Sequence, residues 1–293
     1  MEKLLIIGIS GLVGSRFAEL EKGNYDIYGT YNQHEVAGKN TFKLDTTDRD
    51  TTFKLIERIK PRYIIDTHAL SNVDYCELHP EEAWKVNFDG ARNVAEASKK
   101  YAAKYVFFST DYVFDGSKLN YTEKDKPKPL NYYAKTKLAA EYMLSALDIN
   151  YIAIRTAVIY GKGGMDKVSF PLWVIGKLKN NERINVVTDQ YNKPTFADNL
   201  VEIISKLIEK DENGIFHVTG SELISRFDFA KKVAKEFQLN ESLIEKITSA
   251  ELNQVAKRPS TLNLSTDKVE RITKIKPVGV DEGLKLLKEQ LGW

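Results

Sequence analysis

The sequence predicts an α/β fold with a doubly wound parallel sheet of the Rossmann type and a smaller, discontinuous C-terminal substrate-binding region. Short apolar runs rich in Ile, Val, Tyr and Phe recur between amphipathic stretches, as in parallel strands joined by crossover helices. The glycine-rich segment LLIIGISGLVGSRF follows the first run and leads into an amphipathic stretch. A chain of 293 residues is long enough for such a core with an attached region.

The elements of this fold follow from local patterns. Five apolar runs are predicted as strands: KLLIIG, DIYGTY, RYIID, KYVFFST and YIAIRT. Between them, the segment from about 80 to 101 is predicted as a helix. Pro80 suits its first position, two glutamates follow at its positive end, and two lysines lie at its negative end.

The regular alternation loosens after residue 160. There GKGGMDK predicts a flexible connection, and the βα pattern returns with NVVTDQ and NGIFHVTG. We therefore expect residues 1–160 with 186–219 to form a Rossmann domain. Residues 161–185 with 220–293 are expected to form the smaller region.

The composition limits the classes of molecule that this protein is expected to bind. Lys and Arg number 43 against 41 Asp and Glu, so the net charge of +2 provides no bulk attraction to nucleic acid or to an anionic membrane. The single Cys76 fits a reducing cytoplasm, and the longest uncharged run is too short to span a membrane. No cluster has metal-ligand spacing, so no catalytic metal is expected. The sequence leaves a homodimer open.

Three glycines indicate a dinucleotide site. Gly8, Gly11 and Gly14 lie directly after the first strand in a G-x-x-G-x-x-G spacing. Missing side chains there let the backbone approach a pyrophosphate at the N-terminus of a helix. The alternative is a tight turn that binds nothing, but the preceding strand and the following βαβ pattern favour a ligand.

The end of the second strand bears on cofactor choice. An NAD-selective enzyme usually has Asp or Glu there to bind the ribose 2′-hydroxyl, whereas Thr30, Tyr31 and Asn32 are uncharged. We therefore expect NADPH to be favoured, with NADH still usable.

Further groups are expected near the adenosine half of the cofactor. Asp45, at the end of the third run, is predicted either to accept a hydrogen bond from the adenine amino group or to cap a helix. The nearest cations that could strengthen the preference for NADPH are Arg16, His34 and Lys39.

A tyrosine and a lysine in NYYAKTK are candidates for acid–base chemistry. On a helix, residues three or four apart share a face, which pairs Tyr132 with Lys135 and Tyr133 with Lys137. The second pair has the Tyr-x-x-x-Lys spacing. A nearby cation lowers the pKa of a tyrosine, which is ordinarily about 10. The alternative is a surface pair with no chemical role.

Hydroxyls at a strand end would complete such a site. Ser109 and Thr110 end the run KYVFFST, where a hydroxyl could hold a substrate carbonyl oxygen beside the tyrosine. An ordinary Ser/Thr at a strand end is the alternative.

These features together match the extended short-chain dehydrogenase/reductase pattern. The segments STDYVFDG, PLNYYAKTKLAAE, VDYCE and DQYNKPT resemble signatures of the dTDP-4-dehydrorhamnose reductase family, and the resemblance spans nearly the whole chain. It implies that Tyr133 is the catalytic acid and that Thr110 orients the substrate carbonyl. It also implies that Lys137 lowers the pKa of Tyr133 and holds the nicotinamide ribose. Asn87 falls where the superfamily often has an active-site Asn, with a structural role as the alternative.

The resemblance implies that residues 1–160 with 186–219 form an NADP-binding domain and that residues 161–185 with 220–293 form a nucleotide-sugar-binding region. It also assigns the binding residues. The implied cofactor-binding residues are Gly8, Ser10, Gly11, Leu12, Val13, Gly14, Thr30, Tyr31, Asn32, Asp45, Thr46, His68, Ala69, Tyr133 and Lys137. The implied substrate-binding residues are Val73, Asp74, Thr110, Asp111, Gln190, Pro194, Thr195 and Arg258. One segment departs from the family: Asp66, Thr67 and His68 replace an Asn followed by small alanines. A lone His at a strand end is more often a satisfied polar residue than an acid or a ligand.

The implied function is NADPH-dependent reduction of the 4-keto group of a dTDP-6-deoxyhexulose to dTDP-L-rhamnose in the cytoplasm. A nucleotide-sugar epimerase or dehydratase of the same superfamily is an alternative, although a dehydratase is expected to need a second carboxylate where Tyr112 follows Asp111. Another alternative is a non-catalytic regulatory subunit of methionine adenosyltransferase.

Overall fold

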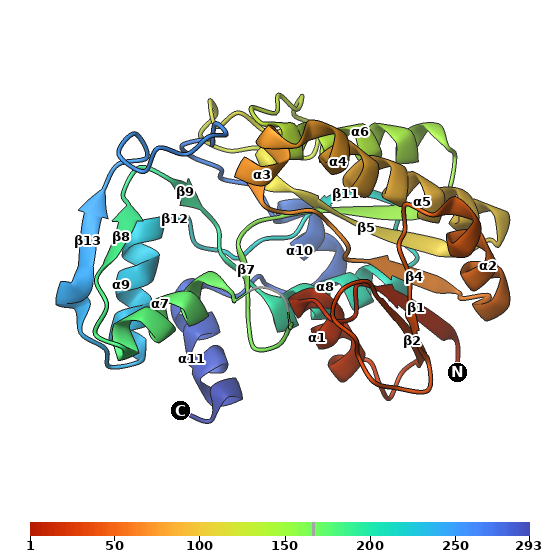
Figure 1. Ribbon diagram of the computed structural model, residues 1–293, viewed down its shortest axis with the longest axis horizontal. Coiled ribbons are helices and arrows are strands. Elements are labelled where there is room, and N and C mark those ends of the chain that lie inside the picture. The colour runs from red at the N-terminus through yellow and green to blue at the C-terminus, as the bar shows by residue number, and fades with distance from the viewer. Residues whose placement is uncertain (166–167) are drawn as a thin grey trace.

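The centre of the protein is a seven-stranded sheet in which every neighbouring pair of strands is parallel. The computed structural model describes residues 1–165 and 168–293 (Figure 1). The strand order is β11 (Gly214–His217), β6 (Tyr151–Thr156), β5 (Lys104–Thr110), β4 (Tyr63–Asp66), β1 (Lys3–Ile7), β2 (Asp26–Tyr31) and β3 (Thr41–Lys43). The chain winds outward from β1 in both directions, which confirms the doubly wound Rossmann prediction.

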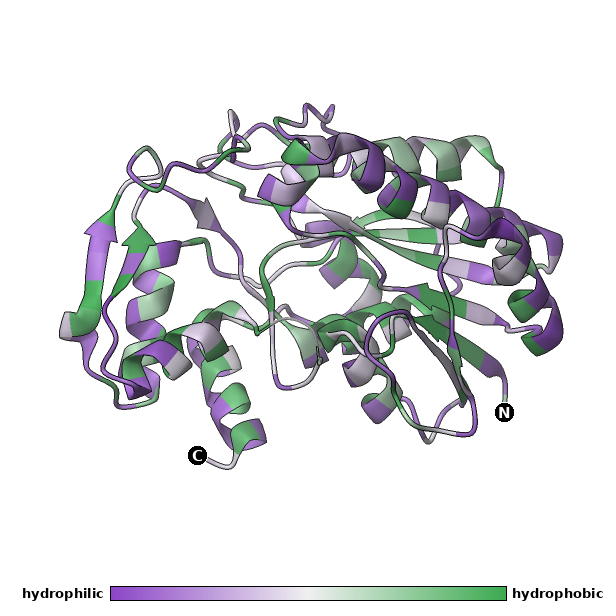
Figure 2. Cartoon of the chain, viewed as in Figure 1, coloured by the Kyte–Doolittle hydropathy of each residue, from purple (hydrophilic) through white to green (hydrophobic). Residues whose placement is uncertain are grey.

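Helices cover both faces of this sheet, so its strands are apolar on both sides. Side chains alternate along β1: Leu4 and Ile6 pack into one core, and Leu5 and Ile7 pack into the other. Figure 2 shows the resulting apolar strands between helices with polar outer surfaces. The first core includes α1 (Leu12–Leu20), α8 (Ala197–Glu209) and α10 (Asp267–Thr273), and the second includes α2 (Arg49–Ile59), α5 (Ala91–Lys100) and α6 (Tyr132–Ala146).

The predicted helix over residues 80–101 is present but is not uniformly α-helical. It consists of α4 (Pro80–Trp84), a π-helical turn η1 (Lys85–Gly90) and α5. The short helix α3 (Val73–Leu78) precedes it. A π turn inside a helix often marks a functional site, and the sequence showed no signal for this one.

A smaller region packs beside the carboxyl ends of the strands. Its third core is formed mainly by α7 (Phe170–Lys179), α9 (Arg226–Glu236), α11 (Val280–Leu291) and the parallel strands β8 (Ile184–Val187) and β13 (Ile244–Ile247). Short pairs and turns complete the fold: β7 (Ile159–Tyr160) with β10 (Thr195–Phe196), β9 (Tyr191–Asn192) with β12 (Ile224–Ser225), η2 (Asp111–Val113) and η3 (Glu241–Leu243).

The two regions are interleaved, at boundaries that differ from those expected. Strand β8 pairs with β13 in the smaller region, whereas α8 and β11 belong to the large sheet and its covering helices. Helix α10 also packs on the large sheet. An apolar run does not record which sheet it will join, so the boundary at residue 186 was misplaced. The expected connection GKGGMDK is described only to Met165, and its last two residues lie outside the described part.

Within the described residues, no helix combines the length and apolar character that crossing a membrane requires.

Candidate active site

The turn after β1 needs its glycines for close approach. Gly8 has φ = 86°, and a Cβ there would lie 2.8 Å from Oγ1 of Thr67 in the loop after β4. A Cβ on Gly14 would lie 2.3 Å from the carbonyl oxygen of Gly8, so this glycine lets α1 pack against the turn. Gly11 precedes the first residue of α1. The turn therefore presents the N-terminus of α1 at the carboxyl end of the sheet.

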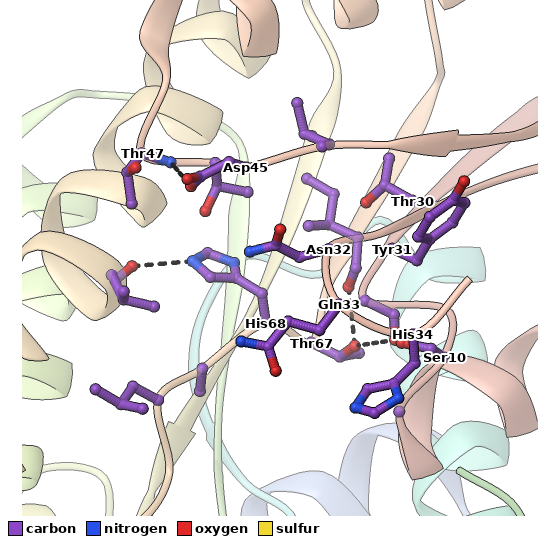
Figure 3. A pocket seen from close by; sticks show the side chains of 18 of the residues that line it. Ser10, Thr30, Tyr31, Asn32, Gln33, His34, Asp45, Thr47, Thr67 and His68 are labelled. Carbon is purple, nitrogen blue, oxygen red and sulfur yellow. Dashed lines mark hydrogen bonds between the residues drawn. The ribbon is translucent and has the colours of Figure 1, made fainter. Parts of the chain in front are cut away.

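A cavity of about 470 Å³ opens above this turn, a size typical of small-molecule sites (Figure 3). The ends of β1, β2 and β4, the loop after β3 and the π turn form its walls. Its lining residues are Ile7, Gly8, Ser10, Gly11, Thr30, Tyr31, Asn32, Gln33, His34, Leu44, Asp45, Thr46, Thr47, Thr67, His68, Ala69, Leu70, Glu82, Lys85 and Val86.

We call this space the dinucleotide cavity, because ten of the predicted cofactor residues line it: Gly8, Ser10, Gly11, Thr30, Tyr31, Asn32, Asp45, Thr46, His68 and Ala69. Val13 and Tyr133 line the neighbouring cavity instead. Leu12 and Gly14 line neither of these two cavities. Leu12 is the first residue of α1, and Gly14 lets this helix pack against the turn. Asp45 does not cap α2: that cap is Asp48, whose side chain accepts from the backbone of Thr51.

Of the three basic residues that the sequence suggested near the cofactor, only His34 lines the dinucleotide cavity. The guanidinium of Arg16 donates to both carboxylate oxygens of Asp198, at 2.5 and 2.6 Å, and also contacts Glu19. Neither Arg16 nor Lys39 lines the dinucleotide cavity. The basic side chains on its wall are those of His34, His68 and Lys85.

A second cavity, of about 390 Å³, adjoins the first and shares Thr67 and Ala69 with it. Its lining residues are Val13, Thr67, Ala69, Ser71, Val73, Phe108, Ser109, Thr110, Asp111, Tyr112, Tyr133, Thr156, Val158, Ile159 and Arg226. Thr110 ends β5, so its position follows from the sheet. Its hydroxyl donates to Asp111 at 3.1 Å and accepts from the backbone of Tyr112 at 3.2 Å.

The cavity distinguishes the two tyrosines of NYYAKTK. Tyr133 lines it from the first turn of α6, which begins after Asn131, whose side chain accepts from the backbone of Ala134 at 2.9 Å. Tyr132 does not line it, and its backbone N–H donates to Glu77. Lys137, one turn beyond Tyr133, is buried, with Nζ 4.1 Å from the ring centre of Phe107.

Burial shifts both members of the Tyr-Lys pair. It lowers the pKa of Lys137 to about 8, while the carboxylates of Asp66 and Glu141 act in the opposite direction. The pKa of Tyr133 is raised, mainly by burial and then by Asp111, whereas the sequence predicted that Lys137 would lower it. A tyrosine with a raised pKa keeps its proton at neutral pH, so Tyr133 is in the protonated form that a proton donor requires.

Asp111 is the carboxylic acid among the lining residues of this cavity. The carboxyl is buried, and within the described residues its Oδ2 has no hydrogen-bond partner. Burial raises the pKa of Asp111 to about 7, and the hydrogen bond from Thr110 opposes the shift. A carboxyl with an unpaired oxygen that faces a cavity can bind a hydroxyl group of a ligand.

Asn87 lies in the π turn with its amide fully engaged. Its Oδ1 accepts from the backbone of Leu70 at 2.8 Å, and Nδ2 donates to the carbonyl of Leu70 at 3.0 Å and to Thr136 at 3.2 Å. These bonds fasten the loop after β4 to α6. A catalytic role for Asn87 stays a prediction.

A third cavity, of about 540 Å³, continues from the second toward the smaller region. Its lining residues are Ser71, Asn72, Val73, Tyr112, Phe170, Trp173, Asn185, Val186, Val187, Gln190, Arg226, Leu252, Gln254 and Arg258. The predicted substrate residues Val73, Gln190 and Arg258 are among them. Asp74 lies behind this wall, where its carboxylate pairs with Arg258 at 2.5 Å.

Like Asp74, two further predicted substrate residues lie outside these three cavities. Thr195 is buried, and its hydroxyl donates to the carbonyl of Ala157 at 2.7 Å. Pro194 packs against Gly220, where a Cβ would lie 2.0 Å from the proline carbonyl oxygen. Both residues support the crossing between the two regions.

Sequence reasoning missed Arg226, which lines the second and third cavities. It is the first residue of α9, whose N-cap Ser225 accepts from the backbone of Asp228 at 2.9 Å. A cation beside the positive end of a helix is unfavourable unless an anion is near. Asp228 in the same turn and Asp111 in the second cavity supply that negative charge, so only the packing of the chain, and no signal along it, placed Arg226 at the cavities.

Among the residues that the structure describes, no group of three or more His, Cys, Asp or Glu is arranged to hold a metal ion.

Similarity to known proteins agrees with this geometry. The family described as "RmlD substrate binding domain" matches residues 1–292. The dTDP-4-dehydrorhamnose reductase of Aggregatibacter actinomycetemcomitans is 33% identical over 97% of this chain and 98% of its own. The chain belongs to the dTDP-4-dehydrorhamnose reductase family.

Two further relatives of this chain differ in the roles that their names give. The Bacillus anthracis dTDP-4-dehydrorhamnose reductase, solved in complex with NADP, has a TM-score of 0.90 and 31% identity over 99% of both chains. The rat methionine adenosyltransferase 2 subunit beta is 28% identical over 92% of this chain and 82% of its own. The relatives of this chain therefore include proteins named as enzymes and a protein named as a subunit.

Proposed function

We propose that this protein is an NADPH-dependent reductase that converts the 4-keto group of a dTDP-6-deoxyhexulose to the alcohol of dTDP-L-rhamnose. The observation that supports it most directly is the position of Thr110 and Tyr133. Both line the cavity that joins the dinucleotide cavity to the cavity beside Arg258. A keto group held there would lie between the cofactor and the rest of the sugar nucleotide.

The residues present fit a nicotinamide dinucleotide. The glycine turn leaves room for a pyrophosphate at the start of α1, and the end of β2 has no acidic side chain to repel a 2′-phosphate. NADP is named in the structure of the Bacillus anthracis relative. We assign NADPH as the cofactor here, with NADH usable at lower efficiency.

The chemistry of the chain's own residues follows from their positions. NADPH, when bound, supplies the hydride. Thr110 holds the carbonyl oxygen by a hydrogen bond, and Tyr133 donates its phenolic proton to that oxygen as negative charge develops. Buried Lys137 holds the nicotinamide ribose and stabilises the phenolate until solvent returns the proton.

The alternatives make different predictions. A dehydratase of the superfamily needs a second carboxylate, and Tyr112 occupies that position. A regulatory subunit is favoured by the likeness to the rat methionine adenosyltransferase 2 subunit beta. A subunit has no chemical need for the set of Thr110, Tyr133 and Lys137, which supports the enzyme.

The test follows NADPH absorbance with dTDP-4-keto-6-deoxyglucose and a 3,5-epimerase, and identifies the product by mass spectrometry and NMR. We expect NADPH to be consumed in step with formation of dTDP-L-rhamnose. No NADPH consumption, together with co-purification of a methionine adenosyltransferase catalytic subunit, would instead establish the regulatory role.

A further inference from the structure

One buried asparagine joins the helix that carries Tyr133 to the loop that carries Arg258. Asn131 immediately precedes α6, and its side chain is buried. Its Oδ1 accepts from the backbone N–H of Ala134 at 2.9 Å, and its Nδ2 donates to the carbonyl oxygen of Lys257 at 3.0 Å. The second bond joins residues that are 126 positions apart in the sequence. The amide thus connects two segments on which the proposed function depends.

The bonding partners fix the orientation of this amide. A backbone N–H can only donate and a backbone carbonyl can only accept, so the oxygen must face Ala134 and the nitrogen must face Lys257. The side chain of Lys257 is exposed, and Asn131 binds its backbone. The bond therefore does not depend on which side chain occupies position 257.

On the helix side, Asn131 is the N-cap of α6. Its oxygen satisfies one of the free N–H groups of the first turn, and the backbone N–H of Tyr132 donates to Glu77 at 2.8 Å. Tyr133 lies in this turn and lines the second cavity. The cap therefore fixes the part of the helix from which Tyr133 reaches the cavity.

On the other side, hydrogen bonds from two helices hold the loop that carries Arg258. Asp74 on α3 accepts from the backbone N–H of Ala256 at 2.9 Å and pairs with the guanidinium of Arg258. Asn131 binds the residue between them, Lys257. This loop lies between β13 and α10, so side-chain bonds of this kind determine where Arg258 stands in the wall of the third cavity.

The bond to Lys257 creates a short path between the two ends of the substrate site. Tyr133 is two residues from Asn131, and Arg258 is one residue from Lys257. A sugar nucleotide whose diphosphate meets Arg258 in the third cavity must place its keto group beside Tyr133 in the second. A displacement of about 1 Å between the two ends can cost on the order of 100-fold in rate, because the reacting atoms lose their alignment.

Capping alone does not explain both bonds of Asn131. Serine, threonine and aspartate also cap helices well, because a cap needs only an oxygen that accepts. The bond to Lys257 needs a donor in addition to the capping oxygen, and the amide of asparagine supplies both. Replacement by serine or aspartate therefore separates the two roles.

We infer that Asn131 is a positioning residue for the reduction, which fixes the loop of Arg258 relative to Tyr133 through the N–H donor of its amide. By this bond a sugar nucleotide held at Arg258 presents its keto group to the phenol of Tyr133. Asn131 lines none of the three cavities, so it acts through these two residues. The inference rests on the proposed function, because it assumes that the second and third cavities hold one substrate.

The test compares Asn131→Ser with wild type in steady-state kinetics with NADPH, dTDP-4-keto-6-deoxyglucose and a 3,5-epimerase. Serine keeps the cap but is too short to reach Lys257. We expect kcat/KM for the sugar nucleotide to fall about tenfold, while the dissociation constant of NADPH stays within about twofold of wild type. Asn131→Asp keeps the cap and the size of the side chain but lacks the donor, so it should show the same loss. It replaces the serine variant should that protein fold poorly.

A second buried asparagine offers a matched control. Asn199 on α8 accepts from the backbone N–H of Val278 at 2.9 Å and donates to the carbonyl oxygen of Lys276 at 3.4 Å. It lines none of the three cavities. Asn199→Ser therefore removes a similar link between a helix and a loop outside the site. Its Tm should fall about as much as that of Asn131→Ser, whereas its kinetic constants should match wild type.

A double-mutant cycle shows whether Asn131 acts through Arg258. In the background of Arg258→Ala the loop has no guanidinium to position, so adding Asn131→Ser should lower kcat/KM by less than about twofold further. If Asn131 acted only by stabilising α6, it would cost the same factor in both backgrounds. Equal losses in the two backgrounds would therefore overturn the inference.

The remaining outcomes distinguish this inference from the proposed function. Wild-type kinetics in both Asn131→Ser and Asn131→Asp would overturn the positioning role and leave the reductase intact. Equal weakening of NADPH binding and of sugar-nucleotide turnover would do the same, because it would indicate a general loss of structure. Absence of turnover in the wild type would instead overturn the proposed function, and this inference with it.

Discussion

The guanidinium of Arg258 lies 2.5 Å from Asp74 and contacts both of its carboxylate oxygens. The pair joins the first turn of α3 to a segment 184 residues later, and the backbone N–H of Ala256 donates to the same carboxylate at 2.9 Å. The arginine lowers the pKa of Asp74, so the acid stays ionised at neutral pH. Asp74, which was expected to meet the substrate itself, thus lies behind Arg258 and holds its guanidinium in the wall of the third cavity.

Replacing Arg258 tests whether this wall binds the sugar nucleotide. Arg258→Ala should raise KM for the sugar nucleotide about tenfold or more, with a much smaller effect on KM for NADPH, because a guanidinium that binds a diphosphate is lost. The exposed Arg183, paired with Glu245, offers a matched control: Arg183→Ala should leave both values near wild type. An unchanged KM for the sugar nucleotide in Arg258→Ala would reduce Arg258 to a structural role.

The choice between adjacent tyrosines is testable in one pair of variants. Tyr133→Phe should lower turnover about 100-fold or more and leave the dissociation constant of NADPH nearly unchanged, because only the donated proton is lost. Tyr132 lies outside the second cavity, so Tyr132→Phe should retain activity. Steady-state kinetics and calorimetry measure the two effects, and an inactive Tyr132→Phe would reverse the assignment.

Cofactor preference depends on the end of β2. Tyr31→Asp places a carboxylate on the wall of the dinucleotide cavity, where it would repel a 2′-phosphate and accept from a 2′-hydroxyl. The ratio of kcat/KM for NADPH to that for NADH should therefore fall about tenfold or more. Lys39→Ala, outside the cavity, is the control. A wild-type enzyme that already prefers NADH would contradict this account.

The raised pKa of Asp111 predicts a pH-dependent stability. Because the folded pKa of about 7 exceeds the ordinary 3.8, folding favours the protonated carboxyl, and the penalty for burying its charge grows as pH rises through 4 to 7. At pH 8 this penalty is on the order of 4 kcal/mol. Asp111→Asn should therefore unfold several degrees above wild type at pH 8, with little difference at pH 4. Calorimetric Tm values at both pH values measure this, and equal differences at the two would exclude the titration of Asp111 as the cause.

Local patterns were sufficient for much of the fold and for the centre of the site. The five predicted strands, the glycine turn and the helix from Pro80 all appear, because side-chain periodicity and end signals act over a few residues. The Tyr133–Lys137 spacing and the position of Thr110 at the end of β5 are likewise consequences of local geometry. The sequence alone therefore determined the fold class and the acid–base candidates.

Only the tertiary structure decided which distant groups meet. Arg16 is engaged by Asp198, 182 residues away, and β8 pairs with β13 instead of joining the large sheet. Periodicity records that a face will be buried, but it does not record the partner that buries it. The same reason explains why Arg226 was missed and why His68, which the sequence marks only as a departure from its family, acquires Val86 as a hydrogen-bond partner. Such contacts arise from the packing of segments that carry no mutual signal along the chain.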